Sequence, residues 1–172
     1  TLVKKIENDS INLGSISEMP RGITVKSSEY FNEQKSGLVQ VLGGTNVERF
    51  LIKDGNKRKP NRYLKTNDIR IKQKKKKVFE NERIIYQNIA SSVPKIVSTL
   101  DDQQLPTDDT LNNLIITDEN YPYEYVLAVL NSKLITFYLR YAIINNSKLT
   151  IHLDKPYLGR IPIKPTNKKN EI

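Results

Sequence analysis

The chain has 172 residues, the length of one ordinary domain, and its 28 lysine and arginine residues against 19 aspartate and glutamate residues give a net charge of +9. It has no cysteine, which excludes disulfide scaffolds, thiolate zinc sites and cysteine nucleophiles. Its single histidine, His152, argues against a His-rich metal site or a His-based triad. No apolar run approaches the roughly 20 residues that a membrane span needs, and no signal peptide is visible, so we expect a cytoplasmic protein.

Short β-prone runs separated by turn signals dominate the first half of the sequence. Residues 11–16 and 38–42 each predict a strand, and the second run stops at Gly43 and Gly44, which predict a tight turn. Residues 46–52 follow and end at the sequence KDGN, whose Asp-Gly pair indicates a hairpin or loop.

The positive charge is concentrated in one segment. Residues 48–77 contain thirteen basic and three acidic residues, whereas residues 96–132 contain seven acidic residues and no basic one. Lysine, asparagine and isoleucine make up 57 of the 172 residues, the bias of an AT-rich genome, but such a bias does not explain the clustering. Residues 57–77 hold too few apolar side chains to bury, so they predict an exposed loop or a solvated helix face.

The second half contains further strands and one helix. Residues 79–89, 96–100, 114–117 and 149–153 predict strands, and residues 123–141 space their apolar side chains as a one-sided amphipathic helix of about eighteen residues does. The whole predicts an α+β fold: a small mixed β-sheet domain with a long C-terminal amphipathic helix and a basic insertion loop. We expect one domain over residues 1–165 and a flexible tail over residues 166–172. Because the sequence begins at Thr1, we expect a fragment of a longer chain.

Catalytic motifs are missing from the sequence. It has no glycine-rich phosphate loop, no GxSxG and no Asn-Pro-Pro-Tyr or Asp-Pro-Pro-Tyr of the kind that holds an extruded base. Glu33 and Lys35 have the E-x-K spelling of a nuclease without the strand-borne carboxylates that would complete it. The paired aspartates at 101–102 and 108–109 lack the spacing of a calcium loop, and we interpret them as a solvated loop.

The basic segment favours a nucleic-acid partner. Clustered Lys and Arg bind phosphate backbones because binding releases condensed counterions. Arginine forks and amide side chains, among them Asn46, Asn61, Asn67, Gln87 and Asn88, are also able to read base edges. A merely soluble lysine loop and a membrane-surface segment are the alternatives, although the stretch lacks the bulky apolar pattern of the latter.

An ordered set of motifs resembles a known family. RGITV (residues 21–25), LVQVLGGTNVERF (38–50), ERIIYQNIAS (82–91), LNNLIITDENYPYEYVLAVLNSKLITFYLR (111–140) and LGRIPIKP (158–165) occur in the order found in the TaqI-like C-terminal specificity domain. This is the target-recognition region of adenine-specific DNA methyltransferases and of type II restriction-modification enzymes. The resemblance extends from about residue 11 to residue 165.

The resemblance implies a catalytically inert fragment that reads double-stranded DNA. It needs no cofactor or metal of its own, because S-adenosylmethionine would bind to a methyltransferase domain upstream in the same prokaryotic, cytoplasmic polypeptide. It also implies that Gly22 and Gly43 permit tight turns, that Arg49 anchors a loop, and that Asn131 and Ser132 support neighbouring loops by hydrogen bonds.

DNA contacts are expected mainly in the basic segment. We expect phosphate contacts from its lysines and arginines, and five further side chains are candidates for groove contacts. The expected contacts are Lys57, Arg58, Lys59, Arg62, Lys65, Arg70, Lys72, Lys74, Lys75, Lys76 and Lys77, with Arg21, Lys26, Gln87, Asn88 and Ser91 as groove candidates. Two other classes stay open: a protein-interaction module of a multisubunit restriction system that docks through the helix at 123–141, and a stand-alone metal-dependent nuclease.

Overall fold

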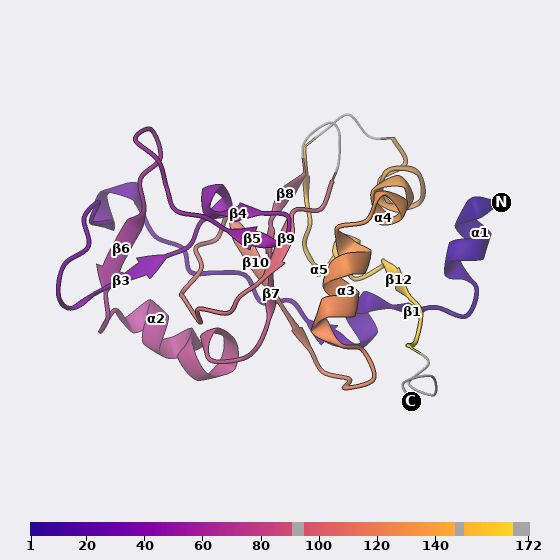
Figure 1. Cartoon of the computed structure of the whole chain (residues 1–172), viewed down its shortest axis with the longest axis horizontal. Helices are drawn as coiled ribbons and strands as arrows, with labels where there is room; N and C mark the ends of the chain where they lie inside the picture. Colours follow the sequence, from indigo (N-terminus) through magenta and orange to yellow (C-terminus); the bar gives the residue numbers. More distant parts are fainter. Residues whose placement is uncertain (91–94, 147–149, 167–172) are drawn as a thin grey trace.

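The computed structural model describes residues 1–90, 95–146 and 150–166, and it confirms the α+β class. Most strands are short, and single helical turns interrupt them (Figure 1). The strands are β1 Ile11–Asn12, β2 Ser17–Glu18, β3 Leu38–Val41, β4 Val47–Glu48, β5 Leu51–Ile52, β6 Arg62–Lys65, β7 Ile84–Gln87, β8 Ile89–Ala90, β9 Ser98–Leu100, β10 Leu111–Ile116, β11 Ile151–His152 and β12 Pro162–Ile163. The helical segments are α1 Leu2–Glu7, η1 Leu13–Ser15, η2 Ser27–Glu29, η3 Gly44–Asn46, α2 Ile69–Lys74, η4 Lys75–Phe79, α3 Tyr123–Leu130, α4 Lys133–Tyr138, η5 Leu139–Ile143 and α5 Lys155–Leu158.

A four-stranded antiparallel sheet lies at the centre of the molecule. Its strand order is β2-β10-β7-β9, with Asn112 opposite Tyr86 and Ile85 opposite Thr99. Strand β10 begins three residues before the predicted run. The apolar pattern missed this start because two of these residues, Asn112 and Asn113, are polar although they are buried. The Asn113 amide donates to the carbonyl of Pro20 at 3.1 Å and to the hydroxyl of Thr107 at 3.0 Å, so its buried amide nitrogen is satisfied.

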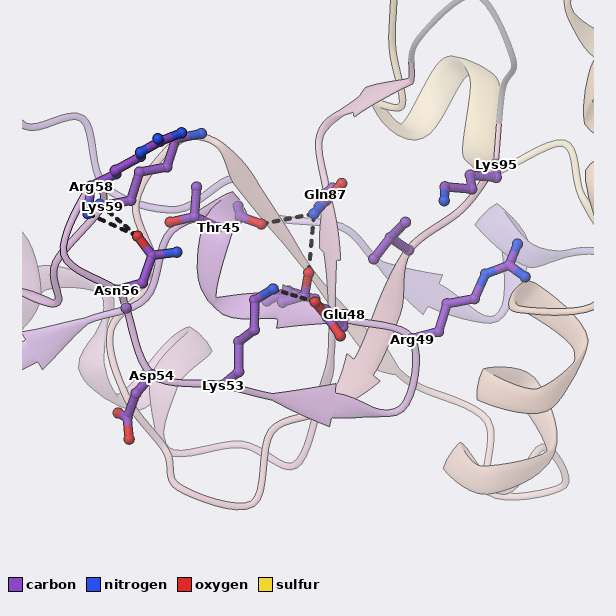
Figure 2. Close-up of a pocket in the computed structure, with 14 residues that line it drawn as sticks. Thr45, Glu48, Arg49, Lys53, Asp54, Asn56, Arg58, Lys59, Gln87 and Lys95 are labelled. Atoms are coloured by element: carbon purple, nitrogen blue, oxygen red, sulfur yellow. Dashed lines mark hydrogen bonds and ion pairs between the residues drawn. The ribbon is translucent and has the colours of Figure 1, made fainter.

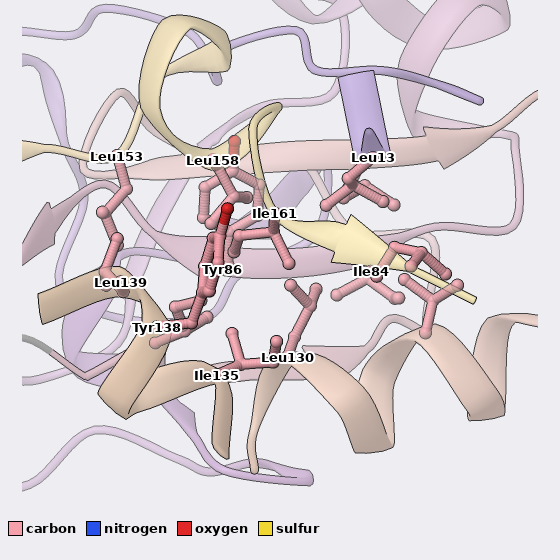
Figure 3. Close-up of a cluster of buried hydrophobic side chains, with 14 of the residues drawn as sticks. Leu13, Ile84, Tyr86, Leu130, Ile135, Tyr138, Leu139, Leu153, Leu158 and Ile161 are labelled. Atoms are coloured by element: carbon pink, nitrogen blue, oxygen red, sulfur yellow. The ribbon is translucent and has the colours of Figure 1, made fainter. Parts of the chain in front are cut away.

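The main hydrophobic core lies between this sheet and the C-terminal helices. Ile84 and Tyr86 of β7 face Leu130, Ile135 and Tyr138 of α3 and α4 (Figure 3). Leu13, Leu153, Leu158 and Ile161 close the cluster from the two ends of the chain. Both ends of the chain therefore contribute to one core.

The prediction of one continuous helix over residues 123–141 is wrong, because the chain forms two helices there. Helix α3 ends at Leu130, and a new helix, α4, begins after Ser132, whose hydroxyl accepts from the backbone amide of Ile135 at 3.1 Å. The side chain of Asn131 accepts from the backbone amide and the hydroxyl of Ser98 and donates to the Ser98 carbonyl at 2.9 Å. This pairing connects the break to the edge strand β9 and confirms the supporting role expected of Asn131, whereas Ser132 caps its own helix instead of a neighbouring loop.

Among the residues that the structure describes, no single helix has the length and apolar character needed to cross a membrane. One pair of helices meets that criterion together, Tyr123–Leu130 with Lys133–Ile143, and the two are bent by 54°.

A second lobe is built from β3, β6, α2 and η4. Strands β3 and β6 pair antiparallel, with Val39 opposite Leu64, and Leu64, Ile71 and Phe79 pack with Ile23 and Val41 in a separate apolar cluster. The prediction of an unburied basic stretch is therefore wrong for β6, although α2 does present a solvated face. The few apolar residues at 63–79 are enough to form a core because they pack against apolar residues at positions 23–41.

Asp101 and Asp108 contradict the interpretation of the aspartate pairs as a solvated loop, because each is buried in an ion pair, whereas Asp102 is exposed and Asp109 is half-buried. Asp101 is fully buried against Arg83, which also donates to the carbonyl of Val78 at 2.8 Å. Asp108 is 2% exposed and pairs with Arg62. Burial raises the pKa of Asp101 above its ordinary value, while Arg83 acts in the opposite direction. Asp101 thus connects the acidic segment to the start of β7, and Asp108 connects it to β6 of the second lobe.

Candidate nucleic-acid interface

Two adjoining clefts lie between the β5–β6 loop of the second lobe and the end of β7, and Figure 2 shows the residues that line the first of them. Their volumes are about 720 Å³ and 680 Å³. We call them the first and second cleft. Four residues line both, namely Gly44, Thr45, Lys59 and Gln87, so the two clefts form one continuous concave surface with the η3 turn at its middle.

The clefts carry an excess of positive charge. Glu48 and Asp54 are the acidic residues among those that line them, against six basic side chains: Arg49, Lys53, Arg58, Lys59, Arg62 and Lys95. A concave basic surface attracts polyanions, and the attraction weakens as salt is added.

The outer wall is a basic turn at the tip of the β5–β6 loop. The backbone amides of Asn56 and Lys59 bond each other's carbonyls at 2.9 and 3.1 Å, and the Asn56 side chain accepts from the amides of Arg58 and Lys59 at 2.9 and 3.0 Å. An asparagine that caps such a turn through its own side chain is a common local device. It fixes the backbone so that Lys57, Arg58 and Lys59 are all exposed.

The floor of the clefts is held by amide side chains. Asn46 is 3% exposed; its side chain accepts from the Gly43 amide at 3.0 Å and donates to the Lys53 carbonyl and to Asn61, both at 3.1 Å. Gln87 donates to the carbonyls of Gly44 at 2.7 Å and Val47 at 3.1 Å (Figure 2). These amides, expected to be able to read bases, instead make internal hydrogen bonds that fix the η3 turn.

Gly22 and Gly43 both pack closely against Asp108. A Cβ on Gly22 would lie 2.0 Å from the backbone carbonyl oxygen of Asp108, so only glycine fits there. A Cβ on Gly43 would lie 2.2 Å from Nη2 of Arg62 and 2.9 Å from a carboxylate oxygen of Asp108, so a larger residue would displace the Arg62 side chain. Both glycines allow a close approach to Asp108, and neither has the positive φ of a turn glycine.

Several expected DNA contacts are engaged inside the protein. Arg62 pairs with Asp108, and its guanidinium covers the Tyr30 ring at 4.6 Å. Burial, with Asp108 next in effect, raises the pKa of Tyr30 to about 12. Arg70 pairs with Asp68 at 2.7 Å and with Glu29 at 3.0 Å. These two arginines stabilise the second lobe.

Lys74, another expected phosphate contact, and the groove candidates Arg21 and Asn88 also have partners inside the protein. Lys74 donates to the carbonyls of Arg21 at 2.5 Å and Gly22 at 2.9 Å, and its burial, with the nearby Arg21 charge, lowers its pKa. Arg21 is partly exposed and pairs with Asp154 at 3.3 Å. Asn88 is buried against Asn112. Ser91 lies outside the described residues.

The remaining lysines divide into separate groups. Lys57 and Lys59, with Arg58, occupy the β5–β6 loop above the β3–β6 pair in Figure 1, whereas α2 and η4 lie below that pair. The lower group is Lys72, Lys75, Lys76 and Lys77, all exposed, and Lys75 pairs with Glu80 at 3.4 Å. Lys65 and Lys26 are exposed at the end of β6 and just before η2. The basic segment is continuous in sequence but not in space.

Three residues of the clefts were not predicted. Lys53 lies within the basic segment but was not expected to contact DNA, Lys95 is an isolated lysine before β9, and Thr45 sits in the predicted turn. No local pattern marks Lys95, because only the fold brings it opposite the β5–β6 loop. Arg49 has the anchoring role expected of it, with Nε donating to the Ile96 carbonyl at 3.2 Å.

Other sites considered from sequence have plain structural roles. Glu33 and Lys35 form an exposed ion pair at 3.3 Å, and His152 is exposed in β11. Within residues 1–90, 95–146 and 150–166, no three histidine, cysteine or acidic side chains gather closely enough to hold a metal ion.

Comparison with known proteins identifies the family. The profile of the TaqI-like C-terminal specificity domain matches residues 39–163, which is more than half of the chain. No curated protein matches the chain. Among solved structures, the HsdS subunit from Thermoanaerobacter tengcongensis is similar over 95% of this chain, with 11% identity and a TM-score of 0.47. The chain covers 38% of that subunit's length. On the family match, the protein belongs to the TaqI-like C-terminal specificity domain family.

Proposed function

We propose that this chain is a DNA target-recognition domain and that its two clefts face double-stranded DNA. The observation that carries the proposal is the concave basic surface of the clefts, with six basic and two acidic side chains, in a chain of a specificity-domain family. In this proposal the basic turn at 57–59 supplies phosphate contacts, and side chains on the floor of the clefts face the base edges.

The enzyme to which the domain belongs is an S-adenosylmethionine-dependent adenine DNA methyltransferase or a fused restriction-modification enzyme. In this proposal the cofactor and the catalytic residues belong to a methyltransferase domain upstream in the same polypeptide, and the present chain is non-catalytic. An Asn-Pro-Pro-Tyr-type motif in the full coding sequence supports this parentage, and a full-length parent gene without any methyltransferase motif contradicts it.

The test compares two triple variants that each remove three positive charges. One carries Lys57→Gln, Arg58→Gln and Lys59→Gln, and the matched control carries Lys72→Gln, Lys76→Gln and Lys77→Gln. Affinity for a randomised duplex is measured across a salt series. Each lost phosphate contact reduces the slope of log affinity against log salt by about 0.9, so we expect the first variant to lose a slope of about 2 to 3 and the control less than about 1.

The outcome separates the proposal from its alternatives. Equal slopes for both variants would place the DNA contacts elsewhere. Absence of salt-dependent duplex binding in the unmodified chain would contradict DNA recognition and favour the protein-interaction alternative. That alternative draws on exposed apolar side chains beside α1 and α4, since Leu2 is 50% exposed and Leu134 49% exposed. Metal-dependent cleavage by the purified chain would instead favour the nuclease alternative.

A further inference from the structure

Thr45 lies where the two clefts meet. It is the central residue of the η3 turn, it is exposed, and it lines both clefts. Figure 2 shows it between Arg58 and Lys59 on one side and Gln87 on the other, with Lys95 beyond Gln87. Within the described part of the chain, its hydroxyl has no intramolecular hydrogen-bond partner, so that group is available to a ligand.

Hydrogen bonds fix the two residues on either side of Thr45, Gly44 and Asn46. The Asn46 amide donates to the Gly43 carbonyl at 2.8 Å, and the Gly44 amide donates to the Thr110 hydroxyl at 2.7 Å. Gln87 binds the Gly44 carbonyl, and the Asn46 side chain connects the turn to the β5–β6 loop through Asn61. Asn61 in turn accepts from the Gly55 amide at 2.7 Å. The turn and the basic tip are thus joined in one hydrogen-bonded network.

A threonine hydroxyl can bond either a phosphate oxygen or a base edge, but only the contact with a base discriminates between sequences. Phosphate affinity comes from charge, which the lysines and Arg58 on either side provide. A threonine offers a methyl group that packs on the thymine methyl and a hydroxyl that bonds base-edge donors or acceptors. Base discrimination requires a precisely placed side chain, and the internal hydrogen bonds of the η3 turn fix the backbone that carries Thr45.

We infer that Thr45 is a base-reading residue of this domain, and that Asn46 and Gln87 are positioning residues that hold it. The inference rests on the proposed function, because it assigns a role within the same DNA-facing surface. Its ligand is one base-pair edge in duplex DNA, with an A·T pair favoured by the threonine methyl group.

The test measures sequence preference separately from total affinity. The 172-residue chain and its Thr45→Val and Thr45→Ser variants are each used to select from a randomised duplex library. Valine keeps the branched shape without the hydroxyl, and serine keeps the hydroxyl without the methyl group. We expect at least one variant to lower the preference at one base-pair position about tenfold, while the salt slope stays unchanged because no charge is altered. Thr66→Val, an exposed threonine outside both clefts, is the control and leaves the preference unchanged.

Each other outcome has a distinct meaning. Salt-dependent binding with an unchanged preference in all Thr45 variants overturns the inference and leaves the proposed function intact. A uniform loss of affinity for every sequence makes Thr45 a backbone contact and also overturns it, as does a chain that binds duplex without any sequence preference. Absence of duplex binding by the unmodified chain overturns the proposed function itself.

Discussion

Arg83 and Asp101 show how a single pair of residues can join two parts of this fold. Both side chains are fully buried, and Arg83 also reaches the carbonyls of Val78 at 2.8 Å and Leu105 at 2.6 Å. The Asp101 carboxylate accepts from the amides of Gln103 and Gln104, both at 3.1 Å. One ion pair thus connects η4, the start of β7 and the acidic segment.

Removing the charge of Asp101 should destabilise the protein strongly. Asp101→Asn keeps an acceptor for the two backbone amides but leaves the buried Arg83 charge without a counterion, for which we expect a loss of about 3–5 kcal/mol in the free energy of unfolding. The control Glu80→Gln breaks the exposed Lys75–Glu80 pair and should cost less than about 1 kcal/mol. Urea denaturation measures both, and similar losses for the two variants would contradict this account.

The sequence predicted the anchoring roles of two residues correctly but did not show which amide side chains are buried. The family resemblance correctly implied that Arg49 anchors a loop and that Asn131 supports a neighbouring segment. The sequence could not show that Asn46 and Asn88 are buried. An asparagine looks the same in a sequence whether its amide faces DNA or donates to a carbonyl inside the protein. Only the hydrogen-bond partners distinguish the two roles.

Helix α2 illustrates stability at the scale of an element. Asp68 caps it by accepting from the Arg70 amide at 2.9 Å, and the Arg70 guanidinium binds both carboxylate oxygens of Asp68 as well as Glu29. The hydrogen bond from Arg70 is the largest cause that lowers the pKa of Asp68 below its ordinary 3.8. The backbone amide of Lys26, followed by Arg70, lowers the pKa of Glu29 below 4.5.

These lowered pKa values predict an acid-sensitive second lobe. A carboxylate whose pKa is lower in the folded state contributes stability above its ordinary pKa, and that stability is lost as the pH falls through the folded value. Asp68→Asn should therefore be less stable than the unmodified chain at pH 7, and the difference should shrink between about pH 5 and pH 3. Urea unfolding at a series of pH values measures the difference. A gap that stays constant down to pH 3 would show that Asp68 does not stabilise the lobe through its charge.

Elements were predictable where one strand or helix carries its own signal. Strand β3 lies within the predicted run at 38–42, and β7 lies within the run at 79–89. The break between α3 and α4 was not predictable from apolar spacing, which continues through Asn131 and Ser132. The cause of the break is tertiary, since Asn131 pairs with Ser98 of β9.

At the scale of the whole molecule, the fold divides one basic segment between two places. The segment at 48–77 forms the outer wall of the clefts with residues 53–60, and then crosses the second lobe as β6 before continuing into α2 and η4 (Figure 1). The sequence could predict a polyanion partner from this charge. It could not predict which lysines act together, because that depends on the antiparallel pairing of β3 with β6.

Lysine footprinting measures directly whether DNA lies against the clefts. The unmodified chain is acetylated at limiting reagent with and without a randomised duplex at low salt, and the extent at each lysine is measured by mass spectrometry. We expect protection of the cleft lysines Lys53, Lys59 and Lys95 and of Lys57 on the adjoining basic turn, with Lys72, Lys76 and Lys77 modified equally in both samples. Protection of the α2 and η4 lysines while these four lysines stay reactive would contradict the proposed interface.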